Sequence, residues 1–144
     1  MFKSDKNVEG KGFVLVEGVY SNSASSTAVK VLVMNIYALC SNKDKVLFWK
    51  EVEEKLATTS CLTRCVIGDF NSVRNDSERK GMNNGKVNMC ELARFSEFIE
   101  SCSLKEIPVV GRKFTWYRPN GTARSRLDRA LVSDEWLLQW SGSK

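Results

Sequence analysis

A helix between two strands is the sequence feature that most constrains the fold of this chain. Residues 29–37 (VKVLVMNIY) and 64–67 (RCVI) are rich in β-branched side chains, as expected of strands. Residues 43–57 have helical spacing, with Ser41 or Asn42 as N-cap and the lysines and glutamates on the outer face. The order strand, helix, strand predicts a layered α/β protein. The predicted buried stripe of the helix is Val46, Leu47, Trp49, Val52 and Leu56.

Other elements are predicted on both sides of this unit. Residues 13–20 are β-prone and precede a small polar loop, which predicts a hairpin with the strand at 29–37. Residues 72–87 are polar and punctuated by glycine, as in a long surface loop, and such loops are often functional. A helix is predicted over residues 88–102, with a buried face of Met89, Leu92, Phe95, Phe98 and Ile99.

The C-terminal part of the sequence predicts a hairpin and a short helix. Residues 113–117 and 126–132 have strand character and flank the turn Pro119-Asn120-Gly121. Ser133 is the predicted cap of a last helix that ends at Trp140. We find no internal repeat and no linker, so residues 1–144 are interpreted as a single domain that is long enough to bury a core.

The composition is typical of globular proteins, with 42% hydrophobic and 27% charged residues. No apolar run approaches the roughly 18 residues that span a bilayer, and the N-terminus has no signal-peptide core. We therefore expect an intracellular protein, nuclear or cytoplasmic, with no membrane contact. The five widely spaced cysteines are expected to be reduced thiols.

The net charge and the absence of histidine limit the partners and the reactions that are possible for this chain. The formal net charge of +5 is compatible with a polyanionic partner. Because the chain has no histidine, a Ser-His-Asp triad is excluded. Any reaction must depend on carboxylates, tyrosine, lysine or a metal ion.

The strand at 64–67 ends in Gly68-Asp69-Phe70-Asn71, which is the candidate centre of that chemistry. Asp69 and Asn71 present short-chain oxygens at the carboxyl end of a strand, and hard cations such as Mg²⁺, or Mn²⁺ as an alternative, prefer oxygen ligands. The other interpretation is an Asp-Asn turn, since both residues favour turns and local backbone hydrogen bonds. These four residues leave both interpretations open.

Two further residues are candidates for the same site. Tyr37 ends the strand at 29–37, at the edge where Asp69 emerges if the two strands share a sheet, and its phenol can donate to a phosphate oxygen. Taken alone, it is a tyrosine at a strand end. Asp128 lies between basic residues, and the alternative for it is a surface ion pair with Arg126 or Arg129.

Residues 111–129 combine six basic side chains with three aromatic ones. Such a surface suits a nucleic-acid backbone, with aromatic rings available for stacking on bases. The alternative is a solvated basic hairpin whose aromatic side chains lie in the core. The candidate nucleic-acid-binding residues are Arg112, Lys113, Trp116, Arg118, Arg124 and Arg126.

Four motifs, taken in order, carry a resemblance to a known family. They are Asn35-Ile36-Tyr37-Ala38, Gly68-Asp69-Phe70-Asn71, Phe114-Thr115-Trp116 and Ser125-Arg126-Leu127-Asp128-Arg129. Over residues 13–140 the chain resembles the endonuclease/exonuclease/phosphatase superfamily, and is most similar to the apurinic-type endonuclease domain of plant non-LTR retrotransposons. The resemblance implies a deoxyribonuclease-I-like fold, a four-layer α-β-β-α sandwich of two mixed sheets.

The same resemblance implies a metal-dependent phosphodiester hydrolase that cleaves DNA, with Mg²⁺ as cofactor. It assigns the nucleophilic water and the metal-bound phosphate to Asp69, and the orientation of that phosphate to Asn71. Tyr37 corresponds to the tyrosine on the phosphate side, and Asp128 to the acid that supports the active site.

The chain also departs from this family. Members have a Gln-Glu segment whose Glu is a principal magnesium ligand, and a closing Ser-Asp-His motif; neither is present here. The resemblance therefore implies a domain truncated at both ends, with a reverse transcriptase in a longer polyprotein. We expect weak or no nuclease activity, because one charge-stabilising donor contributes about 100-fold. Two alternatives stay open: a non-catalytic nucleic-acid-binding remnant, and a phosphatase of the same fold.

Overall fold

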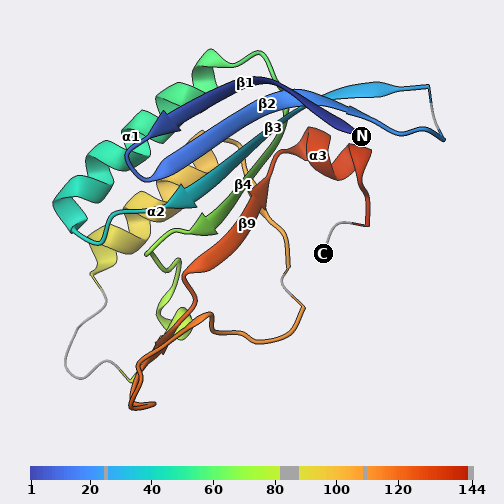
Figure 1. Ribbon diagram of the computed structural model, residues 1–144. Coiled ribbons are helices and arrows are strands. Elements are labelled where there is room, and N and C mark those ends of the chain that lie inside the picture. The colour runs from blue at the N-terminus through green and yellow to red at the C-terminus, as the bar shows by residue number, and fades with distance from the viewer. Residues whose placement is uncertain (25, 82–87, 109, 143–144) are drawn as a thin grey trace.

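Six strands form one mixed sheet, in the order β1-β2-β3-β4-β9-β6. The computed structural model describes residues 1–24, 26–81, 88–108 and 110–142 (Figure 1). β3 and β4 run parallel and are connected by α1 (Asn42–Thr58), which confirms the predicted strand, helix, strand unit. The other neighbouring strands are antiparallel. The strands of this sheet are β1 (Phe2–Gly10), β2 (Phe13–Ser21), β3 (Ala28–Tyr37), β4 (Thr63–Asp69), β6 (Lys105–Glu106) and β9 (Asp128–Val132).

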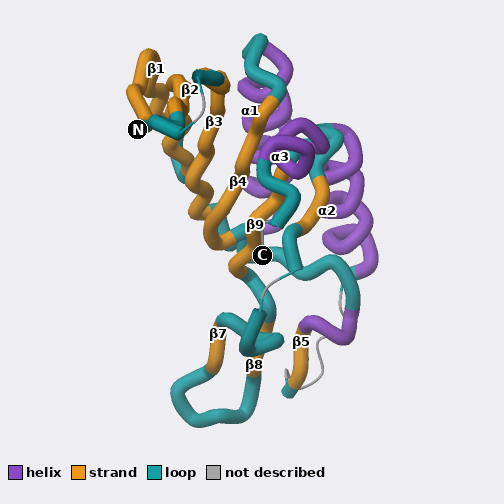
Figure 2. The backbone as a smooth tube through the Cα atoms, turned by 90° about the vertical axis from the view of Figure 1, so that its right-hand side faces the viewer, coloured by secondary structure: helices purple, strands orange, loops and turns teal. Residues whose placement is uncertain are grey.

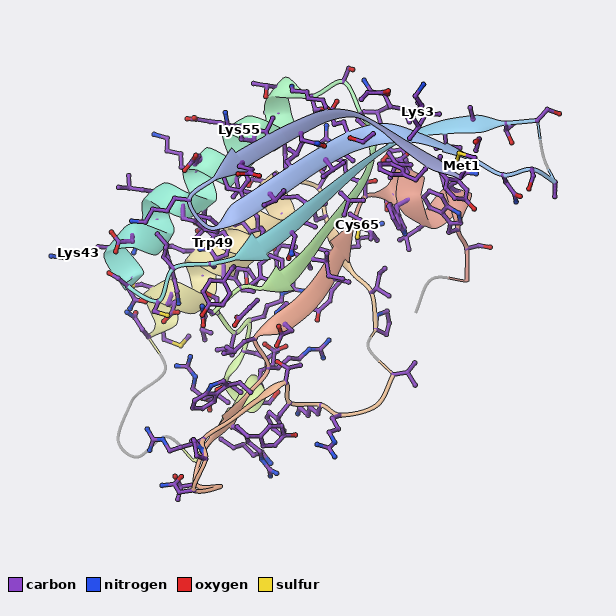
Figure 3. All side chains as sticks on the ribbon, in the orientation of Figure 1. Met1, Lys3, Lys43, Trp49, Lys55 and Cys65 are labelled. Carbon is purple, nitrogen blue, oxygen red and sulfur yellow. The ribbon has the colours of Figure 1, made fainter. Side chains whose placement is uncertain are left out.

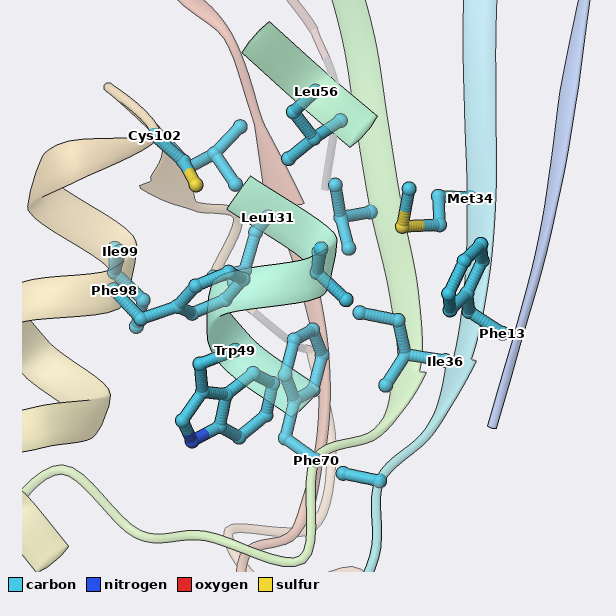
Figure 4. Packing of buried hydrophobic residues seen from close by; sticks show 14 of the residues in the cluster. Phe13, Met34, Ile36, Trp49, Leu56, Phe70, Phe98, Ile99, Cys102 and Leu131 are labelled. Carbon is cyan, nitrogen blue, oxygen red and sulfur yellow. The ribbon is translucent and has the colours of Figure 1, made fainter. Parts of the chain in front are cut away.

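The helices α1 and α2 (Met89–Ser101) cover one face of this sheet (Figure 1). Alternate residues of the central strands, such as Met34 and Ile36, point into the core beneath them (Figure 4). An aromatic cluster joins both helices to the chain after β4, with ring centroids of Trp49 and Phe98 4.6 Å apart and those of Trp49 and Phe70 6.1 Å apart. The short helix α3 (Asp134–Gln139) packs on the opposite face.

The buried face of α1 differs in phase from the prediction. Val46 and Leu47 are 40% and 70% exposed, and Lys45 and Phe48 are buried instead. A run of four apolar residues, 46–49, does not fix the phase of a helix, so contact with the sheet decides it. The prediction that every lysine of α1 lies on the outer face is therefore wrong for Lys45. Met89, also predicted as buried, is 72% exposed because it begins α2, at the end of the helix.

A second, three-stranded sheet lies beyond one end of the large one (Figure 2). Its order is β5-β8-β7, and its strands are β5 (Arg79–Lys80), β7 (Trp116–Tyr117) and β8 (Arg124–Ser125). We call it the small sheet. β5 follows the 3₁₀ turn η1 (Asp76–Glu78), so both lie in the predicted loop 72–87, of which residues 82–87 are outside the described residues.

The predicted hairpin of residues 113–117 with 126–132 is wrong in its pairing. β7 pairs with β8 across the predicted turn. β9, which follows β8 along the chain, belongs to the large sheet and pairs with β4. Strand pairing between distant residues is not visible in local propensity. The predicted α/β class with two sheets is confirmed.

The strand β1 was not predicted. It pairs with β2 along its length and forms one edge of the large sheet, with a register shift between Ser4 and Lys6. All five cysteines are free, and Cys61, Cys65 and Cys102 are buried. Within the described ranges, no helix is both long enough and apolar enough to cross a bilayer.

Candidate functional site

Three strands of the large sheet end side by side and bring three predicted site residues together. Tyr37 on β3 is the register partner of Asp69 on β4, and Asp69 is the register partner of Asp128 on β9. Since neighbouring residues of a strand point to opposite faces and Ile36 and Phe70 lie in the core, Tyr37 and Asp69 face away from α1 and α2. We call these three residues the site row.

The end of β4 is shaped by a glycine and a buried aromatic ring. Gly68 has φ +136°, and a Cβ atom there would lie 2.1 Å from the backbone oxygen of Ile36, so only glycine fits. The side chain of Phe70 is fully buried, and its backbone N–H donates to the oxygen of Leu127 at 2.9 Å. The conformation of Gly68 before Asp69 and the buried ring of Phe70 after it therefore fix the backbone at Asp69.

Asn71 closes a tight turn onto Asp69. Its φ of 47° lies in the left-handed region, its backbone N–H donates to Asp69 Oδ1 at 2.8 Å, and its Nδ2 donates to the oxygen of Ala38 at 2.6 Å. These are the contacts of an Asp-Asn turn, one of the two interpretations of the sequence. Among the described residues, the second Asp69 oxygen and Asn71 Oδ1 accept no hydrogen bond and are available to a cation, so the structure is compatible with both interpretations.

Two acidic side chains, Asp69 and Asp128, are neighbours in the site row. Burial raises the pKa of Asp69, and the negative charge of Asp128 raises it further, while the Asn71 N–H and the charge of Lys45 oppose this shift. Two carboxylates and an amide oxygen fit one Mg²⁺, which commonly takes one or two carboxylates together with water or substrate phosphate. The part of the chain that the structure describes holds no cluster of three or more acidic, cysteine or histidine side chains around a metal position.

Thr115 fixes the backbone at Asp128. Its Oγ1 accepts hydrogen bonds from the N–H groups of Leu127 and Asp128, each at 3.0 Å. Thr115 belongs to the Phe-Thr-Trp motif, but no role is predicted for it from the sequence. The only signal in the sequence was its place in that motif, because the contact joins positions 12 and 13 residues away along the chain.

The residue after Asp128 is the centre of a buried ionic network. Arg129 is 2% exposed, and its guanidinium binds both oxygens of Glu78 and also Glu106, with Nη1 3.0 Å from Glu106 Oε1. Arg126 also pairs with Glu106, at 2.5 Å. We call Glu78, Glu106, Arg126 and Arg129 the ion lock. Burial by itself favours the neutral form of Glu78, but hydrogen bonds from Arg129 and the Arg74 backbone hold its pKa below the usual value.

The predicted nucleic-acid-binding residues divide into two groups. Trp116 and Arg124 belong to the small sheet, Trp116 is 39% exposed, and the Arg124 guanidinium lies 4.7 Å from the ring centroid of Phe114. Arg126 lies in the ion lock, with only 20% of its side chain exposed. Among the described residues, the alternative ion pair of Asp128 with Arg126 or Arg129 is not formed. Exposed basic residues on the connections beside the small sheet are Arg112, Lys113 and Arg118.

Two hollows differ in their relation to this site. A shallow hollow of about 260 Å³ adjoins Tyr37 and is also lined by Asn35 and Val14. A groove of about 510 Å³ lies between the C-terminal parts of α1 and α2 and the start of α3, and none of the predicted site residues lines it. The predicted site residues Tyr37, Asp69 and Asp128 therefore lie at the ends of three strands and not in this groove.

Solved structures share this fold. The 3′ phosphatase NExo from Neisseria, bound to a product DNA hairpin, matches with a TM-score of 0.60 and 18% identity, over 84% of this chain and 52% of that chain. The endonuclease domain of TRAS1, a telomere-specific non-LTR retrotransposon, matches with a TM-score of 0.50 and 13% identity, over 88% of this chain and 52% of that chain. The chain spans about half the length of either structure.

At these identities the likeness shows the fold, and the predicted deoxyribonuclease-I-like fold is confirmed. No protein-family model and no curated protein matches the sequence.

Proposed function

We propose that this chain is a metal-dependent phosphodiester hydrolase that acts on DNA, of the type found in retrotransposon endonucleases. The observation that supports this most directly is the site row, in which Tyr37, Asp69 and Asp128 are register partners on three adjacent strands. A phenol and two carboxylates at one sheet edge form a small set of polar groups that suits phosphate chemistry.

Each residue of the site has a distinct task in this proposal. Asp69 orients the attacking water and accepts its proton. Tyr37 is 68% exposed and donates its phenolic proton to a phosphate oxygen. Asn71 Oδ1 and the carboxylates of Asp69 and Asp128 would hold Mg²⁺ or Mn²⁺. When bound, such an ion neutralises charge that develops on the phosphate.

The small sheet lies beyond the end of the large sheet (Figure 2). DNA is the proposed partner because exposed basic and aromatic side chains lie on the small sheet. Arginine and lysine neutralise phosphates and release counterions, which makes binding depend steeply on salt. Trp116 and Tyr117, 39% and 45% exposed, are available for stacking on bases.

The rate is expected to be low. The chain contains no histidine, and it has no Gln-Glu segment before Phe13. The further resemblance to plant non-LTR retrotransposons leads us to propose a reverse transcriptase in a longer polyprotein. The nucleotide sequence beside the coding segment tests this: a reading frame for a reverse transcriptase supports the proposal, and its absence contradicts it.

The experiment is nicking of supercoiled plasmid by the purified chain, with Mg²⁺ or with EDTA. We expect slow nicking that requires the metal and falls by about 100-fold or more in Asp69→Ala. The matched control is Asp5→Ala, which removes an exposed carboxylate of β1 and leaves the rate unchanged. Nicking that survives EDTA, or that is equal in wild type and Asp69→Ala, contradicts the proposal.

A second candidate function is DNA binding without catalysis, which the absence of histidine and the exposed basic small sheet favour. It predicts duplex binding with a steep salt dependence and no turnover with any metal. A third is phosphatase activity. A panel of 3′-phosphorylated oligonucleotides and small phosphoesters separates it from endonuclease activity, because only a phosphatase releases inorganic phosphate.

A further inference from the structure

A buried lysine contacts the turn that carries Asp69 and Asn71. Lys45 lies in the first turn of α1 and is 5% exposed. Its Nζ lies 2.5 Å from the backbone oxygen of Asn71 and 2.5 Å from Oε1 of Glu91 on α2. The two helices and the turn after β4 therefore meet at one ammonium group.

Two physical effects disfavour a lysine at this position. Burial removes its charge from water, and the first turn of a helix carries the positive end of the helix dipole. The Glu91 carboxylate compensates part of this cost, but a buried ion pair is often no more stabilising than two apolar side chains of the same volume. Fold stability alone is thus a weak reason for the pair Lys45 and Glu91.

The contact with Asn71 supplies another reason. Asn71 has a left-handed φ of 47°, which is unusual for a residue other than glycine. Its backbone N–H donates to Asp69, its side-chain Nδ2 donates to Ala38, and its carbonyl accepts from Lys45. With these three groups engaged, the direction of Asn71 Oδ1 is fixed.

We propose that Lys45, paired with Glu91, is a positioning residue of the candidate site: it holds the carbonyl of Asn71 and thereby sets the direction of the Asn71 and Asp69 oxygens. The effect on catalysis rests on the proposed function, whereas the effect on the conformation of Asn71 does not. Displacing a site group by about 1 Å costs roughly 100-fold in rate, so a contact of this kind is sufficient to matter.

The test compares Lys45→Met, the double variant Lys45→Met/Glu91→Met and the control Lys43→Met. The double variant replaces the buried pair with two apolar side chains, which should keep the fold. Lys43 lies in the same helical turn but is exposed and points outward (Figure 3), so its variant removes an equal charge without the contact. The readouts are thermal unfolding, the ¹⁵N NMR signals of the Asn71 side-chain amide, and kcat and KM for plasmid nicking.

We expect the double variant to unfold near the wild-type temperature but to show Asn71 amide signals like those of a free amide. Its kcat should fall by about 100-fold with little change in KM, while Lys43→Met resembles wild type. A double variant with wild-type amide signals and wild-type kcat overturns the inference, because the pair would then only fill space.

The outcomes separate this inference from the proposed function. If the wild type does not nick DNA, the proposed function fails, and the Asn71 amide signals alone decide whether Lys45 positions this residue. If the double variant does not fold, the ¹⁵N signal of the Lys45 ammonium in the wild type decides. A scalar coupling across the hydrogen bond, from the Lys45 ammonium to the Asn71 carbonyl carbon, supports this bond, and its absence overturns the inference.

Discussion

The two carboxylates of the site row are anchored by different forces. Asp69 is followed by Phe70, which is fully buried among Trp49 and Phe95. Asp128 is followed by Arg129, which is buried in the ion lock. Apolar packing depends little on pH and salt, whereas ion pairs depend on protonation. The positions of the two carboxylates are therefore expected to respond differently to changes in pH and salt concentration.

The largest effect is expected from the apolar anchor. Phe70→Ala leaves a cavity among aromatic rings and should lower the free energy of unfolding by about 3–5 kcal/mol. Urea unfolding at pH 7 and at pH 4 measures this loss, which should be similar at the two pH values. An appreciably smaller loss at pH 4 would contradict this expectation, because it would show that the stabilisation by Phe70 also depends on charged groups.

A somewhat smaller and pH-dependent effect is expected from the ionic anchor. Arg129→Met leaves the buried Glu78 without its guanidinium partner and should cost about 3 kcal/mol at pH 7. The pKa of Glu78 lies below its usual value of 4.5 in the folded chain. The ion lock therefore stabilises the folded chain above that pH, and this stabilisation is lost as pH falls through the folded-state pKa of Glu78.

The loss in Arg129→Met should therefore shrink when urea unfolding is repeated at acidic pH, where Glu78 takes up a proton. Arg112→Met, which removes an exposed arginine, is the control and should be nearly neutral at both pH values. An equal loss at pH 7 and at acidic pH would mean that Arg129 acts through packing, as its position 5.5 Å from the Phe95 ring centroid also allows.

The smallest effect is expected at Asp69 itself and has the opposite sign. Because the folded-state pKa of Asp69 lies above 3.8, the folded chain is stabilised by the proton at low pH, and this contribution is lost as pH rises through the folded pKa. Asp69→Asn removes the charge and should raise Tm at neutral pH in EDTA, while abolishing activity. Asp5→Asn is the control, and a lower Tm in Asp69→Asn would contradict the assignment.

Local patterns in the sequence were sufficient to predict the centre of the fold. β-branched residues identified β3 and β4, and helical spacing identified α1 between them. That order places the carboxyl ends of two parallel strands at one sheet edge, so Tyr37 and Asp69 were predicted to be neighbours. Their roles in chemistry are still a proposal.

Features that depend on distant contacts were not predictable in this way. β1 is almost entirely exposed, so it has no alternation of apolar and polar residues to reveal it. The bond between Arg129 and Glu78 spans 51 residues, and that between Lys45 and Glu91 spans 46. A lysine in a helix suggests an exposed face, and only the fold shows that Lys45 reaches a carbonyl at the site.

The irregular edge strand β1 affects the tendency of separate molecules to aggregate. An exposed, regular strand edge is a template on which another chain can extend the sheet, and this leads to aggregation. The register shift after Ser4 interrupts the template, and Lys3 and Lys6 place positive charges beside it. At the opposite edge, β6 is only two residues long. Both borders of the large sheet thus discourage the growth of fibres, and the protein is expected to stay dispersed at concentrations where a regular edge would polymerise.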